Sequence, residues 1–329
     1  MKKLLLTVNV ITYNHRPWVE KCLDSILEQE TDFDFIVRIF DDCSTDGTLG
    51  ICEQYVKKHP EKVFLYPSEK NLGPKYNPLR SYQGITTPYY LYIEGDDCRI
   101  NPKGFQRQID ILEEHPECSF CAAQTINYRN NSFTDLHPII KQGVYTKEYI
   151  KKNVTTIFFC NLLSRIVRTS CIEYPDGYED CYLSDSLQFY ELIKKGHMYF
   201  IDEIFACYNE TGFGVQSGSK LFERTVSILD LLKEYNKFSN EEFKHCLFFV
   251  FMCEIKAMFY KDIFKELEAE SGKRVMVVEN FKLDNNIKLK NLLRTLRRKF
   301  LYMILPGFIP IFAHAVRDYL RILKNRNYK

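Results

Sequence analysis

The sequence predicts an α/β protein with a mostly parallel central sheet flanked by helices and a helical C-terminal extension. Apolar runs rich in β-branched and aromatic residues alternate with stretches of helical spacing as far as Ile126. Alternation at this rhythm is typical of βαβ crossovers, which build parallel sheets. The chain has 329 residues, of which 45% are hydrophobic, so it can bury a large core.

The first half of the predicted sheet is the easiest to assign. Leu4 to Ile11 is a continuous apolar run, whereas Trp18, Cys22 and Ile26 recur at helical spacing after Pro17. We expect the following elements in chain order: strand 4–11, helix 17–27, strand 35–40, helix 46–56, strand 63–66, helix 79–85 and strand 89–93.

Later elements are clear on either side of an unassigned, turn-rich middle at 127–182. We expect a helix at 102–114 with proline in its first turn, a strand at 119–126, a helix at 184–195 and a strand at 199–208. Gly196 follows the second of these helices and is expected to be a left-handed cap. The pattern from about Leu221 onward is helical, so we divide the chain into a domain at 1–218 and a helical region at 219–329.

Twelve cysteines occur, mostly inside apolar runs, which predicts buried and reduced thiols. Cys118 and Cys121 have metal-ligand spacing, but no second pair follows at the distance a zinc site needs. They are therefore interpreted as strand core. The apolar start at Leu4 to Leu6 lacks a cleavage site and is interpreted as a strand, so we expect a cytoplasmic protein.

The C-terminal tail is strongly basic. Residues 281–329 contain 12 Lys/Arg and 2 Asp/Glu, a local charge of +10 that leaves −8 for the remainder of a chain whose total is +2. The apolar stretch 300–316 within it is interrupted by prolines and is shorter than the roughly 20 residues of a spanning helix. We expect a peripheral contact with anionic lipid at the inner face of the plasma membrane. A helix packed on the domain is the alternative, and nucleic acid binding is not expected, because aromatic residues do not alternate with the basic ones.

Polar clusters directly follow three of the predicted strands. Their members are Thr12, Tyr13 and Asn14 after the first strand, Asp41 and Asp42 after the second, and Glu94, Asp96 and Asp97 after the fourth. Ligands of parallel sheets bind outside the carboxyl ends of the strands, so these clusters are expected to converge on one site. Taken alone, the segment after the second strand could equally be a capped helix start.

Three carboxylates within four residues repel one another, which makes each more costly to ionise. A bound cation would relieve that repulsion at Glu94, Asp96 and Asp97. Oxygen ligands without neighbouring His or Cys suit Mg²⁺ or Mn²⁺. An acidic, solvated turn is the alternative for this segment considered by itself.

These motifs, in this order and spacing, resemble family 2 glycosyltransferases. The resemblance rests on the runs Val8–Asn14, Asp41–Thr48, Asn71–Gly73 and Tyr92–Asp97, and it extends with gaps to about Ser217. It implies the GT-A fold, which binds nucleotide-diphosphosugars. It also implies that Asp97 and Asp96 bind the metal and that the donor is held by Thr12, Tyr13, Asn14, Asp41, Asp42, Asn71, Gly73, Glu94 and Asp96.

The resemblance also implies an inverting mechanism with Asp185 as the catalytic base. An aspartate stabilised at a helix N-terminus is the alternative for Asp185, and Glu179 and Asp180 are competing bases. Many relatives carry Arg and His where this chain has Asn209 and Thr211, in a segment that resembles a donor-covering loop. The Gln-x-x-Arg-Trp signature of processive synthases is absent from the sequence, which favours single-sugar addition.

The expected function is metal-dependent transfer of one sugar from a nucleotide-sugar, with UDP the commonest donor nucleotide of the family and GDP and dTDP open. The expected acceptor is lipid-linked or a glycan, as in surface polysaccharide synthesis. An inactive nucleotide-sugar-binding or scaffold protein of the same fold is the alternative. A dinucleotide-dependent oxidoreductase is not expected, since the turn after the first strand lacks the required glycines.

Overall fold

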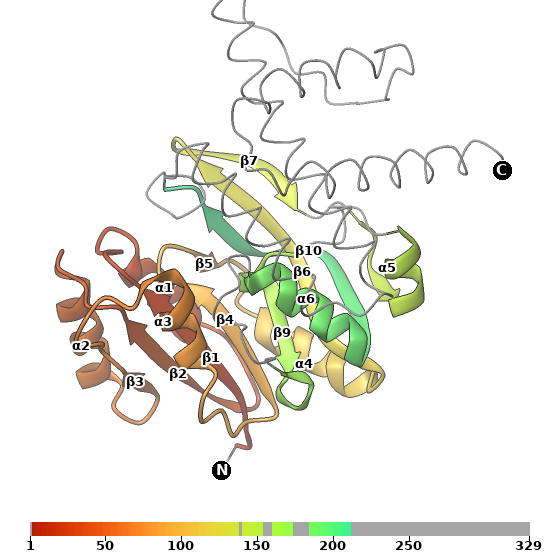
Figure 1. Ribbon diagram of the computed structural model, residues 1–329, viewed down its shortest axis with the longest axis horizontal. Coiled ribbons are helices and arrows are strands. Elements are labelled where there is room, and N and C mark those ends of the chain that lie inside the picture. Colours follow the sequence, from red (N-terminus) through yellow and green to blue (C-terminus); the bar gives the residue numbers. More distant parts are fainter. Residues whose placement is uncertain (1, 138–139, 154–159, 174–183, 212–329) are drawn as a thin grey trace, which may run out of the picture. The chain divides into compact units, whose positions relative to one another are not determined.

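The structure, a computed structural model, describes residues 2–137, 140–153, 160–173 and 184–211 (Figure 1). The predicted C-terminal helical region at 219–329 and its basic tail lie outside these residues. Within the part that is described, none of the helices combines the length and the apolar character needed to cross a membrane.

A ten-stranded mixed sheet with flanking helices makes up this part of the chain. In chain order its elements are β1 (Leu4–Thr12), α1 (Val19–Leu27), β2 (Asp34–Asp41), α2 (Thr48–Lys58), β3 (Val63–Leu65), α3 (Gly73–Ser81), β4 (Tyr89–Glu94), β5 (Cys98–Arg99), α4 (Gly104–Glu114), β6 (Cys118–Arg129), β7 (Ser132–His137), β8 (Gly143–Tyr145), α5 (Lys147–Asn153), the 3₁₀ turn η2 (Leu162–Ser164), β9 (Arg165–Arg168), the 3₁₀ turn η3 (Thr169–Cys171), α6 (Ser184–Lys195) and β10 (His197–Asn209).

The sheet order is β3-β2-β1-β4-β9-β6-β10-β5, with β7 pairing with β6 and β8 with β10. The first four strands in this order are all parallel, as the alternation of strands and helices predicts. Beyond them the sheet is mixed, because β9 runs antiparallel to both β4 and β6. β9 comes from the turn-rich middle of the chain, where the sequence carries no clear strand pattern.

Alternate residues of β4 enter two different cores, as the two-residue period of a strand requires. Tyr89 and Leu91 join a core shared with α1, α2 and α4. Tyr90 joins a second core on the other face, where Phe189 and Leu192 of α6 pack. Cys118 and Cys121 are free and buried in β6, and burial raises the pKa of Cys118 to about 12, so the interpretation as strand core is confirmed.

Two local predictions are wrong. The helix expected at 79–85 is α3, which begins at Gly73 and ends at Ser81. Pro74 stands in its first turn, where a missing N–H removes no helical hydrogen bond, and Gly84 follows with φ 69°. Gly196 after α6 is not left-handed. A Cβ at this position would lie 2.8 Å from the carbonyl oxygen of Glu117 and from the amide nitrogen of Ser119, so close approach to β6 explains the glycine.

We therefore expect Gly196→Ala to lower the free energy of unfolding by about 1 to 3 kcal/mol, because both clashing atoms belong to the backbone and cannot rotate away. Urea denaturation followed by circular dichroism measures this change. Gly50→Ala in α2 is the matched control, since nothing lies within 4 Å of its added Cβ. The control should gain up to about 1 kcal/mol, and equal effects of the two substitutions would contradict the packing argument.

Candidate functional site

Three neighbouring parallel strands end at one edge of the sheet. The register pairs Thr12 of β1 with Asp41 of β2, and Ile11 of β1 with Glu94 of β4. Two backbone hydrogen bonds continue the pairing beyond the strands, from Gly95 N to Ile11 O (2.8 Å) and from Asp42 N to Thr12 O (2.9 Å). The predicted convergence of the three polar clusters is confirmed.

The acidic turn after β4 gathers three carboxylates. Glu94, Asp96 and Asp97 each offer an oxygen, and these oxygens lie within 4.8 Å of one another. Glu94 is exposed, whereas Asp97 is only 3% exposed. Burial raises the pKa of Asp97 well above its ordinary value, and the charges of Asp96 and Glu94 raise it further. Burial also raises the pKa of Asp96.

The end of β10 closes over this acidic turn. The Asn209 amide donates a 2.9 Å hydrogen bond to Asp97 Oδ1. The Thr211 side chain is hydrogen-bonded to Asp96. Burial, followed by the charges of Asp97, Glu94 and Asp96, raises the pKa of Tyr208. The segment from Tyr208 to Thr211 therefore contacts the acidic turn and orients Asp97 and Asp96 through hydrogen bonds.

This donor set fits a hard divalent cation. All three ligand candidates are carboxylates, and Asp96 Oδ1 is buried with no hydrogen-bond partner among the described residues. An unpartnered buried carboxylate oxygen is costly, and a cation such as Mg²⁺ or Mn²⁺ would offset that cost. Exposure of Glu94 leaves one side of the cluster open to a second ligand of such an ion.

Gly95 allows β4 to approach β1 closely at the same place. A Cβ on Gly95 would lie 2.8 Å from Thr12 Oγ1 and 3.0 Å from His15 Nδ1. Both of these atoms are buried without a hydrogen-bond partner in the described part of the chain, as is Asp41 Oδ1. His15 Nε2 lies 3.9 Å from Asp96 Oδ2, while burial lowers the pKa of the imidazole. The end of β1 is therefore surrounded by buried polar atoms that have no hydrogen-bond partner among the described residues.

Several predicted donor residues hold loops in this structure. Both Asp42 oxygens accept backbone hydrogen bonds, from Leu72 N (2.7 Å) and Gly73 N (2.8 Å), where Gly73 has φ 81°. Asn14 Oδ1 accepts a 2.8 Å hydrogen bond from Thr45 N. Asp42 and Asn14 therefore fix the loops that surround the site.

Other residues predicted to bind the donor keep side-chain groups that a ligand could contact. Asp41 uses Oδ2 to accept from Ser44 N (3.0 Å) and keeps Oδ1 unpartnered within the described residues. Tyr13 is 43% exposed, and Asn71 is also exposed. The exposed ring of Tyr13, after β1, offers a stacking face, and the buried Asp41 at the end of the neighbouring β2 offers a hydrogen-bond acceptor.

Three contributions were not predicted from the sequence. His15 was passed over because a lone histidine in a loop carries no ligand spacing. The roles of Tyr208 and of the Asn209 amide depend on the pairing of β10 with β5 and β6, and the Asn209 amide and Asp97 are 112 positions apart in the sequence. A backbone N–H has no sequence signature at all, so only the fold could reveal it.

Asp185 is the second residue of α6, as predicted, and its side chain lies outside the described part of the structure. The competing residues Glu179 and Asp180, and the loop beyond Thr211, are also outside it. One turn after Asp185, Gln188 Nε2 donates hydrogen bonds to Tyr90 OH (2.9 Å) and Tyr82 OH (3.1 Å). These bonds fix the start of α6 against β4, the strand that leads into the acidic turn.

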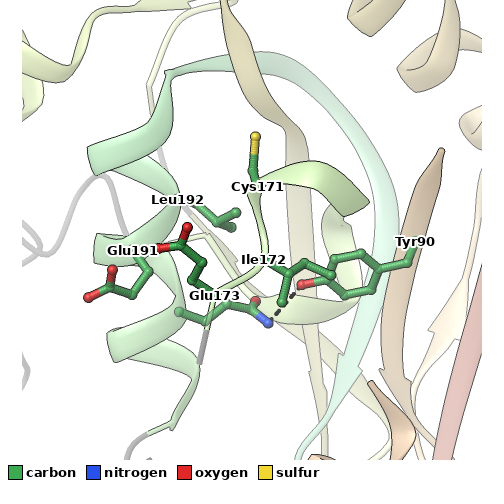
Figure 2. A pocket seen from close by; sticks show the side chains of 7 residues that line it. Tyr90, Cys171, Ile172, Glu173, Glu191 and Leu192 are labelled. Carbon is green, nitrogen blue, oxygen red and sulfur yellow. Dashed lines mark hydrogen bonds between the residues drawn. The ribbon is translucent and has the colours of Figure 1, made fainter. Parts of the chain in front are cut away.

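A pocket lies beside α6, next to the residues at the end of η3 (Figure 2). Its lining residues are Tyr90, Cys171, Ile172, Glu173, Gln188, Glu191 and Leu192. The two glutamates are neutralised locally, since Lys195 pairs with Glu173 (2.6 Å) and Lys194 with Glu191 (2.5 Å). None of the acidic turn contributes to this pocket, so it is not the candidate site.

Comparison with known proteins agrees with this geometry. A family model described as Glycosyl transferase family 2 matches residues 7–172. The dTDP-rhamnosyl transferase RfbG of Shigella flexneri is 44% identical over 105 residues, which cover 31% of this chain and 36% of RfbG. The putative teichuronic acid biosynthesis glycosyltransferase TuaG of Bacillus subtilis is 30% identical over 118 residues, covering 36% and 45% of the two chains. The chain spans about a third of the length of the first curated relatives it matches.

Solved structures show the same fold. TarS of S. aureus in complex with UDP aligns with a TM-score of 0.55 and 19% identity, over 75% of this chain and 70% of TarS. The mannosyltransferase PcManGT of Pyrobaculum calidifontis, in complex with GDP-Man and Mn²⁺, aligns with a TM-score of 0.54 and 14% identity, over 97% and 86%. These alignments confirm the predicted GT-A fold. Because the family model spans half of the sequence, the chain belongs to glycosyl transferase family 2.

Proposed function

We propose that the protein transfers a single sugar from a nucleotide-diphosphosugar to an acceptor hydroxyl, with inversion, at the edge where β1, β2 and β4 end. The observation that carries this proposal is the acidic turn of Glu94, Asp96 and Asp97, set beside unpartnered buried polar atoms of Thr12 and Asp41. One part of this edge suits a cation and the other suits the polar groups of a nucleotide.

Asp97 and Asp96 are the proposed metal ligands, with Glu94 toward the open side of the cluster. When bound there, Mn²⁺ or Mg²⁺ would neutralise charge on the donor's diphosphate as the nucleotide leaves. PcManGT was solved in complex with both GDP-Man and Mn²⁺, which supports a cation in this fold. Asn209 keeps Asp97 oriented through its amide, so the carboxylate needs little reorganisation when a ligand arrives.

The nucleotide is proposed to lie over the loop after β1. Tyr13 offers its exposed ring to the base, while Asp41 and Thr12 offer hydrogen-bonding atoms to base and ribose. Asn14 and Asp42 hold the surrounding loops, Asp42 through the Gly73 amide, and the exposed Asn71 is proposed to contact the donor. UDP is the proposed nucleotide. TarS was solved with UDP and with UDP-GlcNAc, although RfbG is a dTDP-rhamnosyl transferase.

Asp185 is the proposed catalytic base. In an inverting transfer one carboxylate removes the acceptor hydroxyl's proton while the oxygen attacks the anomeric carbon opposite the diphosphate. Its helix, α6, is bound to β4 through Gln188, which gives this part of the chain a fixed relation to the acidic turn. The relatives RfbG, TuaG and a teichoic acid polymerase support a role in surface polysaccharide synthesis. A lipid-linked or glycan acceptor fits that role. We propose that the basic tail binds the inner face of the membrane and so brings the enzyme to this acceptor.

Asp97→Asn should abolish Mn²⁺-dependent UDP binding in calorimetry and reduce donor-sugar hydrolysis on the order of 100-fold, because it removes a charged ligand. The melting temperature of the metal-free protein should not fall, since the substitution also removes a buried and repelled charge. Asp110→Asn on the exposed side of α4 is the matched control. Hydrolysis that persists in wild type with a chelator present would contradict the metal role.

Asp185→Asn should lower kcat for transfer by about 10²-fold to 10⁴-fold while UDP affinity stays unchanged, because only proton removal is lost. Parallel assays of Glu179→Gln and Asp180→Asn identify the base. Full activity of Asp185→Asn together with loss in either of the others would reassign it. Nucleotide binding by the wild type without turnover on any acceptor would favour the inactive scaffold.

Gly95→Ala should weaken UDP binding roughly 10-fold to 100-fold, because its Cβ would separate the ends of β4 and β1 that form the site. Fluorescence titration with a labelled UDP analogue measures the affinity. Gly50→Ala, whose Cβ meets nothing, controls for the change of residue type. An unchanged affinity in Gly95→Ala would show that the nucleotide does not depend on this strand contact.

A further inference from the structure

We propose that the hairpin of β6 and β7 is an acceptor subsite, where a carbohydrate ring of an oligosaccharide stacks on Phe133. This inference rests on the proposed glycosyl transfer and adds the class of acceptor and the element that binds it. It assigns a binding role to a surface that the donor site leaves unused.

The hairpin is a fixed platform rather than a loose loop. Asn130 and Asn131 both have positive φ, 50° and 60°, which is the backbone of a two-residue type I′ turn. The ladder pairs Arg129 with Ser132 and Tyr128 with Phe133. Asparagine tolerates the left-handed region better than most residues, so the sequence itself favours this tight turn.

Phe133 presents an aromatic face to solvent. It is 61% exposed, the largest value among the big hydrophobic side chains of the described residues. Its ring centroid lies 5.2 Å from that of Tyr128, with the planes at 59°, so the two rings form a corner. The electron-rich face of an aromatic ring attracts the polarised C–H groups on one side of a sugar ring. A corner of two rings would hold such a sugar in place.

The platform is joined directly to the acidic turn. Asn209, whose amide binds Asp97, is the register partner of Tyr128 in the β10–β6 ladder. Tyr128 is in turn the partner of Phe133. Two strand spacings of about 4.8 Å therefore separate the Asn209 and Phe133 backbones, which is about 10 Å. A separation of this size suits a sugar of the acceptor next to the one that reacts at the acidic turn.

Polar side chains lie close to the aromatic corner in the ladder, although Asn127 and Arg129 flank Tyr128 along β6 and so project from the opposite face of the sheet. Glu210 accepts a hydrogen bond from Asn127 Nδ2 (3.3 Å) and pairs with Arg129 (3.5 Å). Lys21 Nζ lies 6.0 Å from the centre of the Tyr128 ring. The Lys21 ammonium is a hydrogen-bond donor that suits the oxygen atoms of sugar hydroxyls. An exposed aromatic face with an ammonium group beside it favours a carbohydrate over a purely apolar ligand.

The test is binding of bacterial surface oligosaccharides of three or more sugars on an array, followed by calorimetry with those bound. Phe133→Ala should raise their Kd about tenfold, and Phe133→Leu should do the same because it keeps apolar area but loses the ring. Phe133→Trp should retain binding. Phe64→Ala, an exposed phenylalanine on β3, is the matched control and should bind as wild type does.

Titration of each protein with UDP, GDP and dTDP in the presence of Mn²⁺ separates this inference from the proposed function. Nucleotide binding with oligosaccharide binding that depends on the Phe133 ring supports the subsite. Nucleotide binding with oligosaccharide binding that is absent, or unchanged in Phe133→Ala, overturns the subsite alone. Failure of the wild type to bind any of the three nucleotides overturns the proposed function and the subsite with it.

Discussion

The close joining of three parallel strand ends is the constraint on which the site depends. β1 lies between β2 and β4, and its last residues are bonded to the chain that leaves each neighbour, through Asp42 N and Gly95 N. Backbone hydrogen bonds therefore determine where the acidic turn begins. Since only glycine fits beside Thr12 and His15, the turn can lie against β1 without displacing either side chain. The three carboxylates therefore lie together because the backbone places the acidic turn against the end of β1.

The close packing of these strand ends also determines the electrostatic environment of the acidic turn. Asp97 is buried among like charges, and the neighbouring strand end leaves several polar atoms unpartnered within the described residues. Folding stability alone would not favour such an arrangement, because buried polar groups are normally satisfied. The pattern is what a preorganised site for a cation and a polar ligand requires. Asn209 at the end of β10 and Thr211 two residues beyond it complete it by hydrogen bonding to Asp97 and Asp96.

The sequence predicted those parts of the structure in which local residue patterns determine the element. Apolar runs and helical spacing predicted β1 to β4 and their parallel order, and the polar clusters after them predicted the converging edge. The antiparallel strand β9 was not predicted, because its few apolar residues lie in a turn-rich segment and are fixed by pairing with β4 and β6. Gly196 was misinterpreted because close packing and a left-handed cap both select glycine. The aromatic corner at Phe133 needed the hairpin register, which a single sequence does not show.

The electron–nuclear double resonance spectrum of Mn²⁺ bound to the protein with UDP, GDP or dTDP shows whether the ion and the nucleotide share one site. We expect ³¹P coupling to the bound Mn²⁺ with one of the nucleotides, because the acidic turn would hold the ion where a diphosphate can reach it. We also expect that signal to disappear when the acidic turn is neutralised. Bound Mn²⁺ with no phosphorus coupling, or a signal that survives neutralisation of Asp96 and Asp97 together, would show that the acidic turn does not hold a cation against the diphosphate.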